Sequence, residues 1–276
     1  MLRLFANKAL NFLLMIHQLS NVHPDAKLHS TVMVDAFATV HADVQIGEGT
    51  HIMSNAVVMN GARIGKNCKI FPGAVVSAEP QDLKYEGEYT TTLIGDNTTL
   101  RECVTVNKGT RALGRTEVGS NCLLMAYSHV AHDCIVGNNC VIANGVNLAG
   151  HIVVGDWVVL GGVVAVHQFV RIGNHAFITG GSLVRKDVPP FVKAAREPLS
   201  YAGVNSVGLQ RRGFSDKQIA EIQDLYRILF VQHHNISKAI ESLNGQADFS
   251  AEQTEILNFI RSSERGIMKG YHLEHD

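Results

Sequence analysis

The sequence of 276 residues has almost no net charge and no long apolar run. Its formal net charge is −1, so no overall electrostatic field favours nucleic acid or an anionic membrane surface as a partner. No stretch of about 18 consecutive apolar residues occurs, which argues against a membrane-spanning helix. We therefore expect a soluble protein with no nucleic-acid partner and no integral membrane segment.

Cysteine is scarce, and none of the five cysteines forms a Cys-x-x-Cys motif. Four of them each lie two residues before an aliphatic position of the repeat described below, namely Cys68, Cys122, Cys134 and Cys140. Because alternate residues of a strand share a face, these thiols should lie in the core beside the aliphatic side chains. We expect reduced thiols in a cytoplasmic protein rather than disulfides or a metal cluster, with Cys103 also structural.

The first residues lack the features of a secretory signal. The segment MLRLFANKALNFLL carries Arg3 and Lys8 but has no continuous apolar core and no small-residue cleavage site. One arginine and no serine also make it a weak mitochondrial presequence. We assign residues 1–14 as a leading segment before a folded part that starts near Met15, or as a tail packed on that part.

Branched aliphatic residues recur at every sixth position over most of the chain. The series runs from Leu28 to Val76, resumes from Ile94 to Val106, and continues from Val118 to Val184. A period of six fits neither an α-helix nor a flat array of hairpins. It suits a triangular coil in which each of three short strands sends one aliphatic side chain inward.

Glycine marks one corner in three of the expected coil. It directly follows the aliphatic residue at intervals of 18 residues, for example at Gly119, Gly137 and Gly155. Three hexads therefore make one coil, and successive coils should stack about 4.8 Å apart. We expect these glycines to adopt positive φ where the backbone turns. The predicted fold is mainly β, a parallel β-helix over residues 15–190 with one continuous aliphatic core.

Two stretches interrupt the repeat, near residues 78–92 and near residues 107–116. Both are polar and contain glycine or proline, so they should leave the coil as loops. Long loops on a rigid scaffold often carry binding and catalytic residues.

Beyond the last hexad the pattern becomes helical. The tandem proline of DVPPF ends the coils, because proline cannot donate to a β-ladder. A serine followed three residues later by glutamine opens each of two predicted helices, at Ser215 and Ser250. Gly245 and Gly266 are expected helix ends. Residues 191–276 should therefore form a C-terminal α-helical domain.

Four histidines should lie near one another outside the core. His129 precedes an inward aliphatic residue and His167 follows one, so both point outward, while His132 and His151 fall near corners. Because one coil takes 18 residues, the four should cluster within roughly 10 Å on one wall. Each alone could be a solvated surface histidine, but the grouping favours a site. The same wall is apolar, and trimerisation would bury it.

Several segments stand in an order that resembles a known enzyme family. QDLKYEGE, VTVNKGT, HVAHDCIVGNNC, NLAGH, GGVVAVHQF, DVPPF and LQRRGF follow one another as in bacterial UDP-N-acetylglucosamine acyltransferases, over most of residues 16–270. The resemblance implies a left-handed coil and a homotrimer with active sites between subunits. It also implies transfer of a long 3-hydroxyacyl chain from acyl carrier protein to the 3-hydroxyl of UDP-N-acetylglucosamine. This is the first step of lipid A biosynthesis and uses no cofactor or metal.

The resemblance assigns roles at the reaction centre. His132 would be the general base, which suits an imidazole because it can accept a proton at neutral pH. Asp133 would orient the ring, and the backbone N–H of Gly150 would bind the oxyanion. The sugar oxygen would attack the thioester directly, so no protein nucleophile is needed.

The resemblance also implies the residues that bind substrate. Arg211 matches a diphosphate contact and Arg212 lies beside it, which suits the planar fork of arginine. Gly180 falls at the position that limits acyl length, and a bare glycine there implies a long chain. Further matching positions are Gln81, Asp82, Lys84, His129, His151, Gln168 and Asn205.

Two positions depart from the better-known members of the family. Asn107 stands where those members carry histidine, and Val207 stands where they carry glutamate. The nucleotide contacts and the selectivity of the family therefore do not carry over directly at these two positions.

A local basic rim should meet the acyl carrier protein, because that protein is acidic. A solubilising role is equally open for each candidate. The candidates are Arg171, Arg185, Lys186, Lys193 and Arg196.

Three other functions compete with this one. A different hexapeptide acyltransferase would use acetyl-coenzyme A or another sugar. A γ-class carbonic anhydrase is also a trimeric β-helix, and His129, His132 and His151 could mimic its zinc ligands. A non-catalytic scaffold would tolerate the loss of His132. The sugar-site and Arg-Arg segments favour the acyltransferase.

Overall fold

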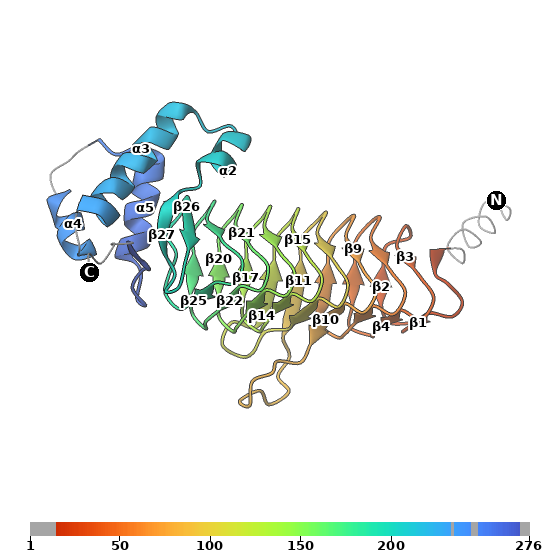
Figure 1. The fold of residues 1–276 in the computed structure, drawn as a ribbon. Coiled ribbons are helices and arrows are strands. Elements are labelled where there is room, and N and C mark those ends of the chain that lie inside the picture. Colours follow the sequence, from red (N-terminus) through yellow and green to blue (C-terminus); the bar gives the residue numbers. More distant parts are fainter. Residues whose placement is uncertain (1–14, 233–234, 244–247, 271–276) are drawn as a thin grey trace.

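The computed structural model describes residues 15–232, 235–243 and 248–270. The described chain is a long three-sided coil of short parallel strands, with a group of helices at the C-terminal end (Figure 1). The expectations for residues 1–14 and Gly245 lie outside the described residues.

Each coil contributes one strand to each of three sheets, which we call face 1, face 2 and face 3 in chain order. Face 1 contains β1 (Asn21–Val22), β4 (Thr39–Val40), β7 (Val57–Val58), β10 (Val75–Ala78), β13 (Thr105–Asn107), β16 (His129–Val130), β19 (Asn147–Leu148), β22 (Ala165–Val166) and β25 (Leu183–Val184). Face 2 contains β2 (Lys27–Leu28), β5 (Gln45–Ile46), β8 (Ala62–Ile64), β11 (Thr91–Ile94), β14 (Arg115–Val118), β17 (Ile135–Val136), β20 (Val153–Val154) and β23 (Arg171–Ile172). Face 3 contains β3 (Met33–Val34), β6 (His51–Ile52), β9 (Lys69–Ile70), β12 (Thr99–Leu100), β15 (Leu123–Leu124), β18 (Val141–Ile142), β21 (Val159–Leu160), β24 (Phe177–Ile178), β26 (Val192–Ala195), β27 (Ser200–Val204) and β28 (Lys269–Gly270).

Strands of one face pair in parallel with the strands of the coils before and after. His129 of β16 lies opposite Asn147 of β19, and Asn147 lies opposite Ala165 of β22. These partners are 18 residues apart, so the predicted coil of three hexads is confirmed.

The turns between faces stack into three edges of the coil. The histidine edge follows face 1 and includes His132 and His151, the glycine edge follows face 2 and includes Gly119, and the third edge follows face 3 and includes Gly180. The third residue after the inward aliphatic side chain takes positive φ at most turns, as in Asp133 (58°) and His151 (62°). The site residues of the histidine edge are therefore held by turn geometry.

The aliphatic residues of the hexads fill the interior of the coil. Val130 and Leu148 are fully buried, and burial of such a side chain contributes roughly 1.5–3 kcal/mol. All five cysteines are free thiols, and Cys103 is half-buried. The predicted inward cysteines are all buried: Cys68, Cys122, Cys134 and Cys140.

The prediction of positive φ at the glycine edge is wrong. Gly119 and Gly137 have no positive φ. A Cβ at Gly119 would instead lie 2.7 Å from the backbone carbonyl carbon of Gly137, and one at Gly137 would lie 2.7 Å from that of Gly155. Glycine is required here because successive coils approach too closely for any side chain.

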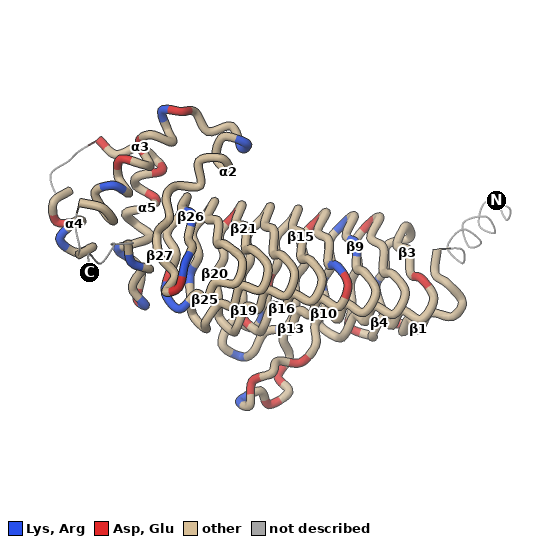
Figure 2. The backbone as a smooth tube through the Cα atoms, viewed as in Figure 1, with Lys and Arg blue, Asp and Glu red and all other residues tan. Residues whose placement is uncertain are grey.

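Both interruptions of the repeat leave the coil at the histidine edge. The longer loop, residues 79–90, joins β10 to β11 and projects from the coil (Figure 1). The shorter loop, residues 108–114, joins β13 to β14. The two loops lie where the sequence predicts them. Charged residues are sparse along the coils and gather on the projecting loop and the C-terminal helices (Figure 2).

The C-terminal part begins with strands and continues as helices. β26 and β27 extend face 3, so residues 191–276 are not purely helical as predicted. The strands form because the last coil leaves an unpaired strand edge on face 3. The helical segments are α2 (Ser206–Arg211), α3 (Asp216–Arg227), the π-helical turn η1 (Ile228–Gln232), α4 (Ile236–Ser242) and α5 (Ala251–Arg261).

The two predicted capping boxes are confirmed at the starts of α3 and α5. The side chains of Ser215 and Ser250 each accept a hydrogen bond from the backbone N–H three residues later. Gly266 lies beyond the end of α5, where Ser262 is the C-cap, so its prediction as a helix end is wrong. None of the described helices is long and apolar enough to span a bilayer.

We expect Gly119→Ala to lower the free energy of unfolding by about 1–3 kcal/mol, because the new methyl group would overlap the backbone of the next coil. Thermal unfolding followed by circular dichroism measures this effect. Gly162→Ala is the matched control, since a Cβ there would meet only the Asn144 carbonyl oxygen at 3.5 Å. Equal midpoints for the two variants would contradict the stacking argument.

Candidate active site

A buried histidine and aspartate form the centre of the histidine edge. His132 is 5% exposed and Asp133 is 3% exposed, so neither is a solvated surface residue. Nδ1 of His132 lies 2.8 Å from Oδ2 of Asp133. A carboxylate only accepts, so the imidazole donates from Nδ1 and keeps Nε2 as a proton acceptor. The backbone N–H of Asp133 donates to Oγ1 of Thr116 at 2.8 Å, which fixes the turn.

The Asp133 carboxylate is surrounded by donors from the shorter loop. The Thr110 backbone N–H donates to Oδ1 at 3.0 Å, and the Thr110 hydroxyl donates to Oδ2 at 2.6 Å. The Leu113 backbone N–H adds a third bond to Oδ1 at 3.2 Å. Burial raises the pKa of Asp133, but the hydrogen bonds from Thr110 and His132 together outweigh burial, and the pKa lies below its ordinary value. The carboxylate is therefore charged at neutral pH.

His151 packs beside His132 from the next coil. The two ring centroids are 5.0 Å apart in an edge-to-face arrangement, and the His151 ring stacks on Phe169 at 4.6 Å. Nδ1 of His151 lies 3.9 Å from Oδ2 of Asp133. Burial lowers the pKa of His151 and outweighs the opposing effect of Asp133. This second imidazole is therefore neutral at pH 7 and can donate or accept a hydrogen bond.

Gly150 lies directly against the face of the His132 ring. A Cβ at Gly150 would lie 2.6 Å from Cε1 and 2.7 Å from Nε2 of His132. Any other residue would displace the imidazole. Within the described part of the chain, the Gly150 backbone N–H has no acceptor. An unpaired N–H next to Nε2 can stabilise an oxygen anion formed beside the base.

His129 lies on face 1 in β16, directly before the turn that carries His132. Its Nδ1 lies 2.7 Å from Oγ1 of Thr105 in the preceding coil. Burial, and to a smaller degree the charge of His132, lowers the pKa of His129. His167 instead lies exposed and pairs with Arg265, whose Nη2 is 3.2 Å from its Nδ1.

The projecting loop places three predicted substrate residues at the same edge. Asp82 is half-buried, and its charge opposes the effect of burial on the pKa of His151. The Lys84 backbone N–H donates to Asp82 Oδ1 at 3.0 Å. The side chains of Gln81 and Lys84 are exposed.

The remaining predicted residues lie apart from His132 within one chain. Gln168 is exposed on the histidine edge, two coils beyond His132. Gly180 is exposed on the third edge, on the opposite side of face 1. Asn205 lies at the glycine edge, where its Nδ2 donates to the His175 carbonyl oxygen at 3.0 Å. Within one chain, the three-sided coil therefore separates the predicted site residues among its three edges.

The two adjacent arginines of α2 have different surroundings. Arg211 is exposed. The Arg212 guanidinium lies over the Trp157 ring at 5.3 Å, and its Nη1 is 3.2 Å from Nδ1 of His175. Burial and the charge of Arg212 lower the pKa of His175 to about 4, so this imidazole is neutral and can accept from Arg212. Arg212 thus fastens the end of α2 to the glycine edge.

The two positions that depart from the family pattern differ in burial. Asn107 is 2% exposed, and its Nδ2 donates to the Glu79 carbonyl oxygen at 3.0 Å, which ties together the starts of both loops. Val207 is 60% exposed on α2.

Sequence reasoning missed Thr110 and Phe169. Thr110 lies in a loop without periodic pattern, so no repeat position marks it. Phe169 occupies a turn position of positive φ (65°), which the hexad spacing could have placed one coil beyond His151. Their contacts come from coil stacking and loop closure.

The donor set of this edge does not fit a zinc site. Ligand atoms of His132, Asp133 and His151 lie within 4.8 Å of one another, whereas His129 is not part of this group. Zinc needs three protein ligands with free electron pairs. Four donors already occupy the Asp133 oxygens, and Nδ1 of His132 carries the proton that it donates. A metal bound through Asp133 would have to displace these bonds. His129 lies outside the group, so the His129, His132 and His151 set of the carbonic anhydrase alternative does not come together within the described residues.

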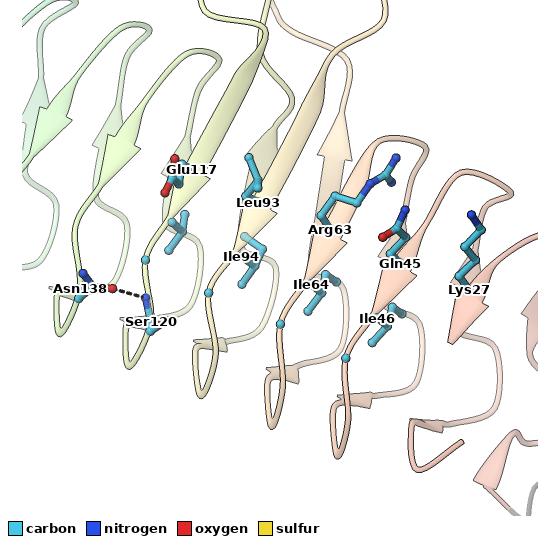
Figure 3. Close-up of a pocket in the computed structure, with 15 residues that line it drawn as sticks. Lys27, Gln45, Ile46, Arg63, Ile64, Leu93, Ile94, Glu117, Ser120 and Asn138 are labelled. Atoms are coloured by element: carbon cyan, nitrogen blue, oxygen red, sulfur yellow. Dashed lines mark hydrogen bonds between the residues drawn. The ribbon is translucent and has the colours of Figure 1, made fainter. Parts of the chain in front are cut away.

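A groove of about 550 Å³ runs along face 2 and the glycine edge (Figure 3). Gln45, Arg63 and Leu93 line it from face 2, and the Arg63 guanidinium is paired with Asp43 at 2.6 Å. The groove contains none of the predicted site residues. Four glycines line it along the glycine edge, namely Gly47, Gly65, Gly95 and Gly119.

Two family patterns match the chain. The C-terminal pattern, described as Udp N-acetylglucosamine O-acyltransferase; Domain 2, matches residues 187–268. The bacterial transferase hexapeptide pattern of six repeats matches residues 43–78 and 115–150.

Curated relatives match over most of their length. The acyl-[acyl-carrier-protein]–UDP-N-acetylglucosamine O-acyltransferase of Myxococcus xanthus is 48% identical over 255 residues, covering 92% of this chain and 99% of the relative. An enzyme of the same name from Xanthomonas oryzae pv. oryzae is 49% identical over 196 residues, covering 70% of this chain and 74% of the relative.

Solved structures have the same fold. A UDP-N-acetylglucosamine acyltransferase from Bacteroides fragilis superposes with a TM-score of 0.90 at 45% identity, covering 92% of this chain and 100% of that one. The predicted left-handed parallel β-helix with a C-terminal helical region is therefore confirmed.

We expect Asp133→Asn to reduce stability at pH 7 by about 1–3 kcal/mol, because an amide cannot accept all the bonds that the charged carboxylate accepts. The pKa of Asp133 is lowered in the folded protein, so its contribution is present above the unfolded value, near 3.9. It is lost as pH falls through the lower folded value. Urea unfolding at several pH values should show the difference from the parent protein shrinking below about pH 4.

The exposed Asp25→Asn serves as the control and should change little at any pH. A destabilisation by Asp133→Asn that persists unchanged in acid would contradict this account of the carboxylate.

Proposed function

The chain belongs to the UDP-N-acetylglucosamine O-acyltransferase family, and we propose that it transfers a long 3-hydroxyacyl chain from acyl carrier protein to the 3-hydroxyl of UDP-N-acetylglucosamine. This reaction is the first step of lipid A biosynthesis. The observation that carries the proposal is the buried His132–Asp133 pair with the free N–H of Gly150 against its ring. The relatives named above carry the same activity in their names.

His132 acts as general base in this proposal. Its Nδ1–H is donated to Asp133, so Nε2 accepts the proton of the sugar 3-hydroxyl as the oxygen attacks the thioester carbonyl carbon. The tetrahedral oxyanion takes a hydrogen bond from the Gly150 N–H, and such a donor typically contributes about 3 kcal/mol of transition-state stabilisation. The C–S bond then breaks, and the imidazolium returns the proton to the sulfur. The sugar ester and the free thiol of the carrier leave.

The acyl chain lies across face 1 in this proposal. Face 1 lies between the histidine edge and the third edge. One hexad of six residues crosses it, and at about 3.3 Å per residue the distance between the two edges is about 20 Å at most. Gly180 lies at the far side of face 1 from His132. A Cβ at Gly180 would already meet the Gly162 carbonyl oxygen at 3.0 Å, so a larger side chain would project into the path of the chain. The bare glycine therefore suits a long acyl group.

A homotrimer would bring the separated residues together. The base lies on the histidine edge, whereas Asn205 and Arg211 lie on the glycine edge, and the two edges border face 2. The glycine edge of a second copy can complete the site if it lies against the histidine edge of the first. Three such contacts close a ring with face 2 turned toward the axis. The outward Ile135 and Val153 make face 2 apolar at this level, which suits burial.

Arg211 suits the diphosphate of UDP because its exposed guanidinium can donate two hydrogen bonds at once.

The acidic carrier protein delivers the thioester to the histidine edge, where Lys186 is exposed near the last coil. Two other candidates of the basic rim have intramolecular partners: Arg171 donates to Ser262, and Arg185 pairs with Glu197 at 2.9 Å. We place the reaction in the cytoplasm, which suits five free thiols.

A different hexapeptide acyltransferase remains the second candidate function. Incubation with UDP-N-acetylglucosamine and a mixed pool of acyl carrier proteins, followed by mass spectrometry of the products, tests the proposal. A 3-hydroxyacyl sugar nucleotide supports it. Product from acetyl-coenzyme A alone would favour the second candidate.

We expect His132→Ala to lower kcat by about 10²–10⁴-fold, because the variant has no group to accept the hydroxyl proton. The rate of product formation measures this loss, and unchanged thermal unfolding shows that the fold is retained. His29→Ala is the matched control, since this exposed histidine lies in an early coil far along the axis. An active His132→Ala variant would refute the assignment of the base.

We expect Gly180→Met to shift the preferred donor toward shorter acyl chains, because the side chain would occupy the end of the path across face 1. Competition between long and short acyl donors in one reaction measures the ratio of products. An unchanged ratio would remove Gly180 from the acyl site.

A further inference from the structure

Thr110 is the residue of the shorter loop that contacts both oxygens of Asp133. It is 6% exposed and lies on the loop between β13 and β14. Its backbone N–H is 3.0 Å from Oδ1, and its hydroxyl oxygen is 2.6 Å from Oδ2. The second of these oxygens is the one that accepts from Nδ1 of His132. The threonine hydroxyl and the imidazole therefore meet on one carboxylate atom.

We propose that Thr110 is a positioning residue for the acyl transfer, whose hydroxyl holds Asp133 so that Nδ1 of His132 donates and Nε2 remains the proton acceptor. This inference rests on the proposed function, in which His132 is the base. Oδ2 accepts from the hydroxyl on one side and from the imidazole on the other, so the hydroxyl fixes the rotation of the carboxylate about its Cβ–Cγ bond. It also draws negative charge away from the imidazole.

Most of the hydrogen bonds that anchor the loop do not involve this hydroxyl. The Lys108 N–H donates to the Ala78 carbonyl oxygen at 2.9 Å, and the Gly114 N–H donates to the Thr110 carbonyl oxygen at 2.7 Å. The Thr110 and Leu113 N–H groups remain on Oδ1 whatever the side chain at position 110. Replacing the hydroxyl with a methyl group removes the bond to Oδ2 and also the acceptor of the Ala112 N–H, which lies 3.2 Å from Oγ1. The four backbone N–H bonds above still anchor the loop, and Thr110→Ser keeps both bonds of the hydroxyl.

Other charged and titratable groups face this carboxylate and imidazole. His151 lies 3.9 Å from Oδ2, the charge of His132 lowers the pKa of His129, and the charge of Asp82 raises the pKa of His151. The buried Cys134 thiol follows Asp133 in the chain. None of these groups donates to Oδ2 within hydrogen-bond distance in the described structure, so none replaces the hydroxyl.

The test compares Thr110→Val with Thr110→Ser in the full-length protein. A hydrogen bond to a buried carboxylate is among the stronger kinds, so we expect Thr110→Val to lower kcat by about 10–100-fold with little change in KM for UDP-N-acetylglucosamine. Thr110→Ser keeps the hydroxyl and should restore kcat to within about threefold of the parent, by the same reasoning.

Thr90→Val is the matched control, because Thr90 is a buried threonine whose hydroxyl has no partner among the described residues. It should leave kcat unchanged. Thermal unfolding of all three variants shows whether the loop remains folded.

The pH dependence of kcat/KM provides a reading that a purely structural role would not change. Without the hydroxyl, the negative charge on Oδ2 is less dispersed and stabilises the protonated imidazole more strongly. The acidic limb of the profile should therefore move to higher pH in Thr110→Val and return in Thr110→Ser. A limb that stays in place or moves to lower pH overturns the proposal, as does a loss of kcat that serine does not restore.

The outcome is separable from that of the proposed function. If His132→Ala is inactive and Thr110→Val behaves as the parent protein, only the role of Thr110 fails. If His132→Ala remains active, the assignment of the base fails, and the role of Thr110 fails with it.

Discussion

The stacking of one coil on the next, about 4.8 Å apart, is the constraint on which the rest of this structure depends. Where no loop intervenes, a coil strand pairs with the strand 18 residues away, as His129 does with Asn147. The stack closes only if the interior is filled by aliphatic side chains of similar size and if the first turn residue of the glycine edge carries no Cβ. At Gly119 the backbone of the next coil is 2.7 Å from the place a Cβ would take, so a single methyl group meets main-chain atoms that cannot move independently.

The same stacking arranges the chemistry. Residues that are 18 positions apart become neighbours, so His151 lies beside Asp133 of the preceding coil, and the rings of His132 and His151 meet with centroids 5.0 Å apart. Both loops leave from the same edge, and the shorter one closes over Asp133. The turn residues are held by positive φ and by hydrogen bonds to the adjacent coil, which gives a rigid frame for the imidazole. In the proposed reaction, such a frame would hold the base and the oxyanion donor in place before substrate arrives.

The buried carboxylate illustrates how competing effects are balanced at this edge. Burial alone would favour the neutral acid at Asp133, whereas hydrogen bonds from Thr110, Leu113 and His132 favour the charged form, and the bonds prevail. A carboxylate saturated in this way has no electron pair left for a metal ion. The charged carboxylate therefore holds the His132 ring with Nδ1 as donor and Nε2 as acceptor, which is the tautomer that the proposed proton transfer requires.

The sequence by itself determined the coil, its inward residues, the positions of both loops, the capped helices and the proximity of His132 to His151, because each of these follows from a local or periodic pattern. No observed contact joins His167 to this pair within the described residues, and His167 lies with Arg265. The sequence also indicated the family, through short segments such as HVAHDC and LQRRGF. Only the tertiary structure decided three other features. These are the close approach of the coils that requires the glycines, the contact of Arg212 with Trp157, and the hydrogen bond from Thr110 to Asp133. A period fixes which side of a strand a residue occupies, but it carries no information about an aperiodic loop or about contacts between edges. Those contacts depend on distances that exist only once the coils are stacked.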